Sequence, residues 1–252
     1  MSAADPPRIG LITGGTKGIG RAIAERVAPD LDGVVLNYAH DDAAAERAGV
    51  AVEAGGAEVR LVRADVGTDG GIGRIAETVD GLDGRLEILV HGAAWPVSAD
   101  PLTIALDDFE RAVRTNGTSL LHLVRAVHHR LGRGSSIIML SSHGAKAVID
   151  GYLALGVPKA LAEALVRYLA VALAPEGVSV NSLSPAGVPT DAVRAVLPDP
   201  AAPLEQLRER TPWPRTVTAE DVAHAVSAVW SGSLPLVTGQ DLVIDGGLYL
   251  RA

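Results

Sequence analysis

The sequence predicts an α/β protein in which a doubly wound parallel sheet carries helices on both faces, and three observations lead to that prediction. Short runs rich in β-branched residues alternate with longer helical stretches, which is the pattern of βαβ units. Several of these runs are apolar almost throughout, as strands are when helices cover both faces of a sheet. The chain has 252 residues, of which 48% are hydrophobic, and it shows no linker or internal repeat, so a single domain is expected over residues 1–252.

The first half of the chain supplies four of the expected strands. Residues 8–14 (RIGLITG) and 33–39 (GVVLNYA) are short apolar runs, and the stretch between them predicts a helix at 18–28. A second helix is expected at 41–56, where alanines alternate with spaced charges. Two further strands are expected at 58–66 (EVRLVRADV) and 86–93 (LEILVHGA).

The second half continues the alternation and contains one irregular segment. Strands are expected at 135–142, 178–185 and 241–247, with a long helix at 160–177. Residues 186–216 follow a strand end and contain prolines that interrupt any long helix. Because ligands bind at the carboxyl ends of strands in open α/β sheets, this segment is a candidate substrate lid. The alternative is an ordinary surface excursion.

The composition excludes several classes of function. The chain has no cysteine, so it offers neither a disulfide nor a thiolate site, which suits a cytoplasmic location. Its net charge of −8 argues against nucleic-acid binding. No apolar run approaches the roughly 18 residues that span a bilayer, and the first residues show no secretory signal, so no membrane association is expected. No cluster of His, Asp and Glu has metal-ligand spacing, so no metal is predicted.

A glycine-rich turn, TGGTKGIG, follows the first expected strand and opens a helix. Gly14, Gly18 and Gly20 would permit a tight turn and a close backbone approach to a pyrophosphate. The first N–H groups of the helix would then face the phosphates. This context predicts a Rossmann-type dinucleotide site.

The end of the second strand indicates which dinucleotide is bound. A carboxylate there would bind the ribose hydroxyls of NADH and repel a 2′-phosphate. The strand instead ends in Asn37, Tyr38 and Ala39, and Lys17 lies within the glycine turn. NADPH is therefore favoured over NADH, although two aspartates follow at 41–42. Lys17 as a solvated surface residue is the alternative.

These residues, together with others in the same order, resemble the short-chain dehydrogenase/reductase family over essentially the whole chain. The matching motifs include ADV at 64–66, Asn116 in RTNGTSLL, Ser142 in MLSSHG, and VTGQDLVIDGG near the end. The resemblance implies cofactor contacts from Gly14, Thr16, Lys17, Gly18, Ile19, Gly20, Asn37, Tyr38, Ala39, Asp65, Val66, Gly92, Ala93, Lys159, Pro185, Val188 and Thr190.

The chain departs from the family pattern at the tyrosine that usually precedes the lysine by four residues. Here that position is Leu155, and Tyr152 precedes Lys159 by seven. This spacing is similar to that of the FabL-type, NADPH-using enoyl-acyl-carrier-protein reductases. Pro158 is expected in the first turn of the helix or at a kink. The family's NNAG motif also reads HGAA at 91–94.

The resemblance implies that Tyr152, Lys159, Ser142 and Asn116 form the catalytic set. Tyr152 would stabilise an enolate, Lys159 would hold the nicotinamide ribose, and Ser142 and Asn116 would line and order the site. The leading interpretation is an enoyl-thioester reductase of fatty acid or polyketide biosynthesis, with its substrate on an acyl carrier protein or coenzyme A. A carbonyl (3-oxoacyl or other ketone) reductase and a non-catalytic cofactor-binding protein are the alternatives.

The expected helix at 160–177 also predicts an assembly. It is apolar around most of its circumference, and Glu163, Arg167 and Tyr168 are the main interruptions. Such a helix needs cover on two faces. In the resembled family a second subunit supplies the outer cover, so a homodimer or homotetramer is expected. Cover by the lid or by a neighbouring helix is the alternative.

Overall fold

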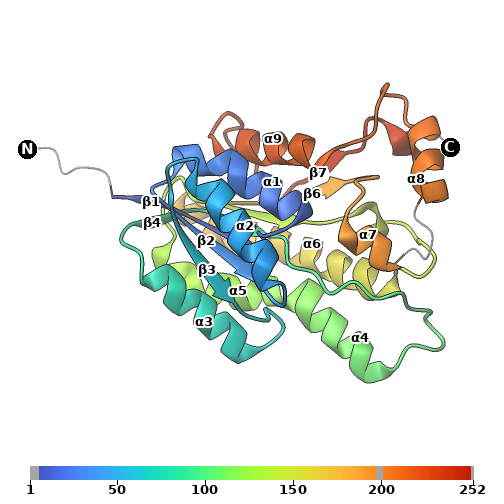
Figure 1. Cartoon of the computed structure of the whole chain (residues 1–252), viewed down its shortest axis with the longest axis horizontal. Helices are drawn as coiled ribbons and strands as arrows, with labels where there is room; N and C mark the ends of the chain where they lie inside the picture. The colour runs from blue at the N-terminus through green and yellow to red at the C-terminus, as the bar shows by residue number, and fades with distance from the viewer. Residues whose placement is uncertain (1–5, 197–200, 251–252) are drawn as a thin grey trace, which may run out of the picture.

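The computed structural model describes residues 6–196 and 201–250. Within these residues a seven-stranded parallel sheet has the order β3-β2-β1-β4-β5-β6-β7 (Figure 1). The strands are β1 (Arg8–Thr13), β2 (Gly33–Tyr38), β3 (Glu58–Arg63), β4 (Arg85–His91), β5 (Ser136–Leu140), β6 (Ser179–Pro185) and β7 (Asp241–Ile244). The predicted fold class, a doubly wound parallel sheet in a single α/β domain, is confirmed.

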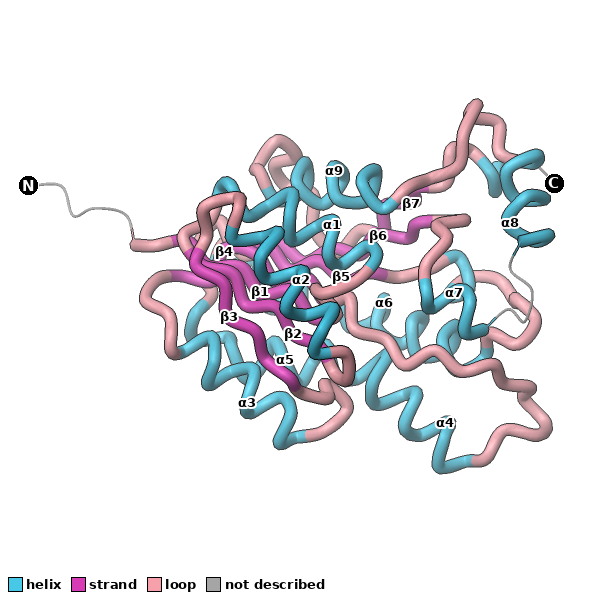
Figure 2. Tube along the Cα trace, in the orientation of Figure 1, coloured by secondary structure: helices cyan, strands magenta, loops and turns pink. Residues whose placement is uncertain are grey.

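Helices form a layer on each face of the sheet, as Figures 1 and 2 show. One layer consists of α1 (Gly18–Val27), α2 (Asp42–Glu53) and α9 (Ala219–Trp230). The other consists of α3 (Asp69–Asp80), α5 (Ser119–Val127) and α6 (Leu153–Leu173). Three further helices, α4 (Leu106–Val113), α7 (Asp191–Val196) and α8 (Ala201–Arg210), lie toward the end of the molecule to which the strands point.

The start of several helices is marked by a side-chain cap. Asp41 accepts a hydrogen bond from Ala44 N at 2.9 Å and so begins α2. Thr68 accepts one from Gly71 N at 3.0 Å and begins α3. These caps satisfy backbone N–H groups that have no partner within the helix, and this explains where both helices begin.

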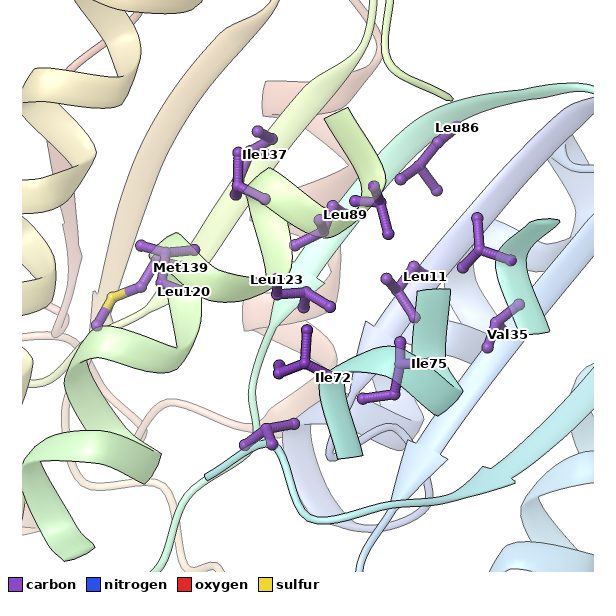
Figure 3. Packing of buried hydrophobic residues seen from close by; sticks show 14 of the residues in the cluster. Leu11, Val35, Ile72, Ile75, Leu86, Leu89, Leu120, Leu123, Ile137 and Met139 are labelled. Carbon is purple, nitrogen blue, oxygen red and sulfur yellow. The ribbon is translucent and has the colours of Figure 1, made fainter. Parts of the chain in front are cut away.

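The core lies on both sides of the sheet because alternate strand residues face opposite layers. Figure 3 shows the side that α3 and α5 cover, where helical leucines and isoleucines reach the strands. The residues labelled there are Leu11, Val35, Ile72, Ile75, Leu86, Leu89, Leu120, Leu123, Ile137 and Met139. This packing fixes the strands, and so the loops at their carboxyl ends have a rigid base.

Some boundaries differ from those expected. β3 ends at Arg63, so the residues at 64–66 belong to the loop that follows it. α6 begins at Leu153, so Pro158 lies inside the helix and not in its first turn. The candidate lid at 186–216 contains α7 and α8, while its residues 197–200 lie outside the described part of the chain. No helix among the described residues is long and apolar enough to cross a membrane.

Candidate active site

The glycine turn between β1 and α1 has the backbone geometry that a dinucleotide requires. Gly14 adopts a φ of 64°, in the left-handed region, and a side chain at Gly20 would place its Cβ in steric conflict with Gly14 O. Lys17 occupies the N-cap of α1 without a side-chain cap, so the first N–H groups of the helix are not capped by it. A pyrophosphate would fit this turn, because its oxygens would accept from those N–H groups.

Two other segments meet this turn. Thr13 Oγ1 accepts hydrogen bonds from Gly92 N at 3.1 Å and Ala93 N at 3.2 Å, which joins the ends of β1 and β4. A Cβ at Gly18 would approach only the Thr190 side chain, at 3.6 Å. Thr190 thus lies beside the turn, where the resemblance expects a phosphate contact. Val188, two residues earlier, is buried.

A cavity of about 350 Å³ opens beside the glycine turn, where the adenosine ribose is expected. Lys17 Nζ lies 2.5 Å from Asp41 Oδ2, and this ion pair lowers the pKa of the Asp41 carboxyl. Arg21 and Arg47 also line the cavity. Neither arginine was among the predicted cofactor residues, because nothing local in the sequence indicates that Arg47 on α2 faces the turn before α1.

The side chains at the end of β2 form hydrogen bonds with neighbouring segments of the protein. Asn37 Nδ2 donates to Val62 O at 3.2 Å and to Ala64 O at 2.8 Å, so this buried amide holds β2 to β3. Tyr38 Oη donates to Asp42 Oδ1 at 2.9 Å. A cofactor contact from Asn37 stays a prediction, and in this structure its side-chain amide is engaged with the backbone of β3 and just after it.

The second aspartate after β2 is also engaged. Asp42 Oδ2 lies 3.1 Å from Arg63 Nη1, and Arg63 Nε donates to Ala39 O at 3.4 Å. Because Asp41 pairs with Lys17 and Asp42 pairs with Arg63, each carboxylate next to the cavity has a cationic partner. This pairing weakens the repulsion that either would exert on a 2′-phosphate.

A larger cavity, of about 490 Å³, lies between the loop after β3 and the helix α4. Asp65 lines it and accepts a hydrogen bond from Gly67 N at 2.8 Å. Val66 beside it is buried, and Arg111 lies 4.0 Å from the Asp65 carboxylate. The resemblance implies cofactor contacts from Asp65 and Val66, so this cavity is a candidate for part of the cofactor site.

Tyr152 stands at the N-cap of α6 and its ring lies over two glycines. A Cβ at Gly144 would come within 2.5 Å of the ring, and one at Gly156 would come within 2.5 Å of Gly144 O. The two glycines therefore allow the turn His143–Ala145 to pack directly against α6, and the ring of Tyr152 lies beside both glycines. Burial raises the pKa of the Tyr152 phenol, and a hydrogen bond with Ser142 lowers it in part. The phenol therefore keeps its proton near neutral pH.

Lys159 lies on the same face of α6, about 10 Å further along the helix axis. Its side chain is buried, and its Nζ donates to Leu140 O at 2.6 Å. Burial lowers the pKa of Lys159 to about 8, while the nearby Glu163 carboxylate raises it. The ammonium is thus held at the carboxyl end of β5, beside Ser142.

Asn116 connects the helix of Lys159 to the loop after β4. It lies in a π-helical turn, Arg114–Thr118, and is fully buried. Its Oδ1 accepts from Trp95 N at 2.7 Å, and its Nδ2 donates to Ala154 O at 2.8 Å. Pro158 has no N–H for that carbonyl, so Asn116 supplies the missing donor inside α6. This explains how the helix accommodates its proline.

Leu155 is buried, with 3% of its surface exposed. The position where ketone reductases of the resembled family carry their tyrosine therefore offers only a hydrocarbon. Tyr152, Ser142 and Lys159 lie where the carboxyl end of β5 meets the first turns of α6. Asn116 stabilises the start of α6 through its hydrogen bond to Ala154 O. Which of them act in catalysis stays a prediction.

An aromatic residue that no sequence motif predicts, Tyr249, also lies near the site. The ring of Tyr249 stacks on that of His143, with centroids 3.3 Å apart and an interplanar angle of 8°. Asp245 holds this segment by accepting from Gly247 N and Tyr249 N. Burial and then the charge of Asp245 raise the pKa of Tyr249, and the negative charge of an ionised Tyr152 would add to the rise, so the two phenols are electrostatic neighbours. Only folding brings residue 249 next to residue 143.

His91, the first residue of the HGAA segment, is fully buried at the end of β4. Ser119 Oγ donates to Thr115 O at 2.7 Å, so it accepts from His91 Nε2 at 2.8 Å, while His91 Nδ1 has no partner among the described residues. Burial lowers the pKa of His91 to about 3, and the charge of Lys159 acts in the same direction. His91 is therefore a neutral imidazole at physiological pH.

The described residues contain no group of three or more His, Cys, Asp or Glu arranged to hold a metal ion.

Comparison with known proteins places these features in a family. Residues 14–249 match the family described as Enoyl-(Acyl carrier protein) reductase. The 1-cyclohexenylcarbonyl-CoA reductase of Streptomyces collinus is 30% identical over 253 residues, which cover 100% of this chain and 90% of that protein.

Two solved structures resemble the chain over nearly its whole length. A short chain dehydrogenase from Burkholderia cenocepacia in complex with NADP is 29% identical with a TM-score of 0.84, and the match covers 95% of this chain and 96% of that one. LugOII is a promiscuous reductase that catalyses keto-reduction at C1 during lugdunomycin biosynthesis. It is 27% identical with a TM-score of 0.87, and the match covers 97% and 98%.

Proposed function

The chain belongs to the short-chain dehydrogenase/reductase family, and on this basis we propose that it is an NADPH-dependent reductase of enoyl thioesters. The family match and the NADP-bound relative support the coarser statement that it is an NAD(P)-dependent oxidoreductase. The enoyl thioester is the finer proposal. The name of the Streptomyces collinus relative describes such a compound, a thioester whose double bond is conjugated with the carbonyl. The acyl group is expected on an acyl carrier protein or on coenzyme A.

The observation that carries the proposal is the position of the Tyr152 phenol. It lies near Ser142, whose hydroxyl partly offsets the rise that burial causes in its pKa, and it precedes Lys159 by seven residues. Leu155 is buried and cannot donate a proton. In ketone reduction the acid protonates an oxygen bonded to the carbon that receives hydride. In enoyl-thioester reduction hydride goes to the β-carbon, and negative charge collects on an oxygen two atoms further away. A tyrosine set back along α6 suits the second reaction.

The residues of the chain would divide the work as follows. NADPH supplies the hydride when it is bound. Tyr152 donates its O–H to the thioester oxygen as charge collects there, and Ser142 orients the phenol. Lys159 holds the nicotinamide ribose and keeps the field near the phenol positive. Asn116 fixes the start of α6, which carries Tyr152.

The preference for NADPH is proposed from the cavity beside the glycine turn. Lys17, Arg21 and Arg47 line it, and cations of this kind bind a 2′-phosphate through charge-assisted hydrogen bonds. Both nearby aspartates are already paired with cations. A free carboxylate, which would favour NADH, is therefore missing from these two positions.

Turnover of two thioesters tests the reaction. NADPH oxidation is measured with a crotonyl thioester and with an acetoacetyl thioester, and the crotonyl compound is expected to be the better substrate. Tyr152→Phe should lower its turnover about a hundredfold, since one oxyanion donor is worth about 3 kcal/mol, and should leave NADPH affinity nearly unchanged. Tyr168→Phe, an exposed tyrosine on the same helix, is the matched control. Wild-type turnover by Tyr152→Phe would contradict the assignment.

A carbonyl reductase is the second candidate function. The likeness to LugOII, a keto-reducing enzyme, and the nearness of Ser142 to the Tyr152 phenol favour it. Preferential turnover of the acetoacetyl thioester would establish this function. NADPH binding without turnover of either compound would indicate the non-catalytic protein instead.

We also propose a homodimer or homotetramer in which α6 meets its counterpart in another subunit. Tyr168 and Val171 on this helix are 79% and 78% exposed, and Val157 is 47% exposed. In the described part of the chain, neither the candidate lid nor a neighbouring helix covers these side chains. An isologous contact would bury them on both subunits.

A cytoplasmic location stays a prediction.

A further inference from the structure

Leu140, Ser141 and Ser142, at the end of β5 and just after it, contact side chains of α6 and of its N-cap. Leu140 O accepts from Lys159 Nζ at 2.6 Å, and Ser141 Oγ donates to Glu163 Oε1 at 2.6 Å. The Ser142 hydroxyl lies near the Tyr152 phenol and lowers its pKa, against the larger opposite effect of burial. The first and third of these contacts belong to the proposed catalytic residues. The second, between Ser141 and Glu163, has no part in the mechanism above.

Glu163 is an unusual residue to bury. Its exposed fraction is 8%, and that of Lys159 is 5%. The two stand four residues apart on α6, so their side chains share one face of the helix. Burying a carboxylate costs free energy unless a hydrogen bond or an opposite charge compensates for it. Ser141 supplies the hydrogen bond, and the charge of Lys159, one helical turn earlier, acts on the carboxylate at longer range without a direct ion pair.

The other groups that face Lys159 carry no charge near pH 7. His91 approaches from β4, and its depressed pKa of about 3 keeps it neutral. The end of β5 presents the Leu140 carbonyl, and the phenol of Tyr152 keeps its proton because burial raises its pKa. Burial lowers the pKa of Lys159 to about 8, and the charge of Glu163 is the influence that raises it.

We propose that Glu163 is a positioning residue of this active site, whose buried carboxylate, fixed by Ser141, keeps Lys159 in its ammonium form. The proposal rests on the proposed function, in which that ammonium holds the nicotinamide ribose and sets the field at the Tyr152 phenol. Without the carboxylate, burial alone would favour the neutral amine at the pH where the enzyme works. The site would then lose its cation without losing its shape.

The pKa of Lys159 can be measured directly because the chain has few lysines. The chain has only three lysines, Lys17, Lys146 and Lys159. Protein labelled with ¹³C at lysine Cε is titrated by NMR without cofactor or substrate, and Lys17→Ala and Lys146→Ala assign the signals. The wild-type Lys159 signal is expected to titrate near pH 8. In Glu163→Gln, which keeps an acceptor for Ser141, its midpoint should fall by about one unit or more.

Two control variants separate charge from structure. Ser141→Ala removes the hydrogen bond and keeps the charge, so the midpoint of Lys159 should stay close to the wild-type value. Glu176→Gln changes an exposed glutamate just beyond the end of α6 and should leave the midpoint unchanged. An unchanged midpoint in Glu163→Gln, or an equal fall in Ser141→Ala, would overturn the proposal.

The consequence for function is read from the pH profile of turnover. In Glu163→Gln the basic limb should move to lower pH by the same amount as the Lys159 midpoint, and a limb that stays in place would also overturn the proposal. NADPH affinity measured against pH serves if no thioester is turned over. Because the titration needs no substrate, failure of the enoyl-reductase proposal is distinguishable from failure of this one.

Discussion

Acidification is expected to destabilise the protein through His91. In the native state this imidazole is buried with its pKa lowered from 6.5 to about 3, whereas in the unfolded chain it titrates at its ordinary value. The unfolded state therefore binds the extra proton first. The stabilisation is complete above about pH 6.5 and is lost progressively as the pH falls toward about 3. A proton on Nδ1 would have no acceptor among the described residues and would lie near the ammonium of Lys159.

The size of the effect follows from the two pKa values. Each pH unit below 6.5 costs about 1.4 kcal/mol, so at about pH 5 the loss due to His91 is about 2 kcal/mol. The free energy of unfolding is measured by urea denaturation at about pH 7.5 and about pH 5, at one fixed protein concentration because subunit association would shift the midpoint. His91→Asn keeps a donor for Ser119 and does not titrate. It should lose about 2 kcal/mol less than the wild type over this range.

The comparison between variants cancels the titration of all other groups. His40→Asn, at an exposed histidine, should lose as much stability as the wild type. If His91→Asn and the wild type lose the same free energy between the two pH values, His91 is not the neutral buried group that the structure describes, and the reasoning is refuted.

Three further outcomes are expected. Lys17→Ala should weaken NADPH binding much more than NADH binding in a fluorescence titration, and equal weakening of both would show that Lys17 acts on the pyrophosphate or the turn. Gly156→Ala should lower both stability and turnover because its Cβ would approach Gly144 O to 2.5 Å. Gly73→Ala, in α3 with open space around it, should lower neither and should stabilise the helix slightly. Similar behaviour of the two variants would contradict the packing of Tyr152. Val171→Arg or Ala164→Arg should yield smaller or insoluble species by light scattering. Val50→Arg, at an exposed position of α2, should not. A wild-type monomer of 25.9 kDa would contradict the proposed assembly.

The amino-acid sequence alone specifies the layered architecture and the location of the cofactor turn. Strand runs and glycine spacing are local signals, because an extended apolar run or a left-handed glycine depends mainly on its own residues. For this reason the spacing of Gly14 and Gly20 is enough to predict a tight turn that leads into a helix. Gly14 adopts a left-handed φ, and a Cβ at Gly20, in α1, would conflict with Gly14 O. Leu155 is likewise recognisable from the sequence as a residue without a proton to give.

The partners of these residues depend on how distant segments pack. Nothing near Pro158 in the sequence indicates that Asn116 donates to the carbonyl that the proline leaves free, since the two lie 42 positions apart. Arg47 reaches the cofactor cavity from the next helix, and Tyr249 reaches His143 from the far end of the chain. The spacing of Lys159 and Glu163 identifies them as neighbours on a helix, but their burial against the end of β5 has no local signal. Burial, which sets the pKa values of His91 and Lys159, exists only when separate segments pack together and exclude water.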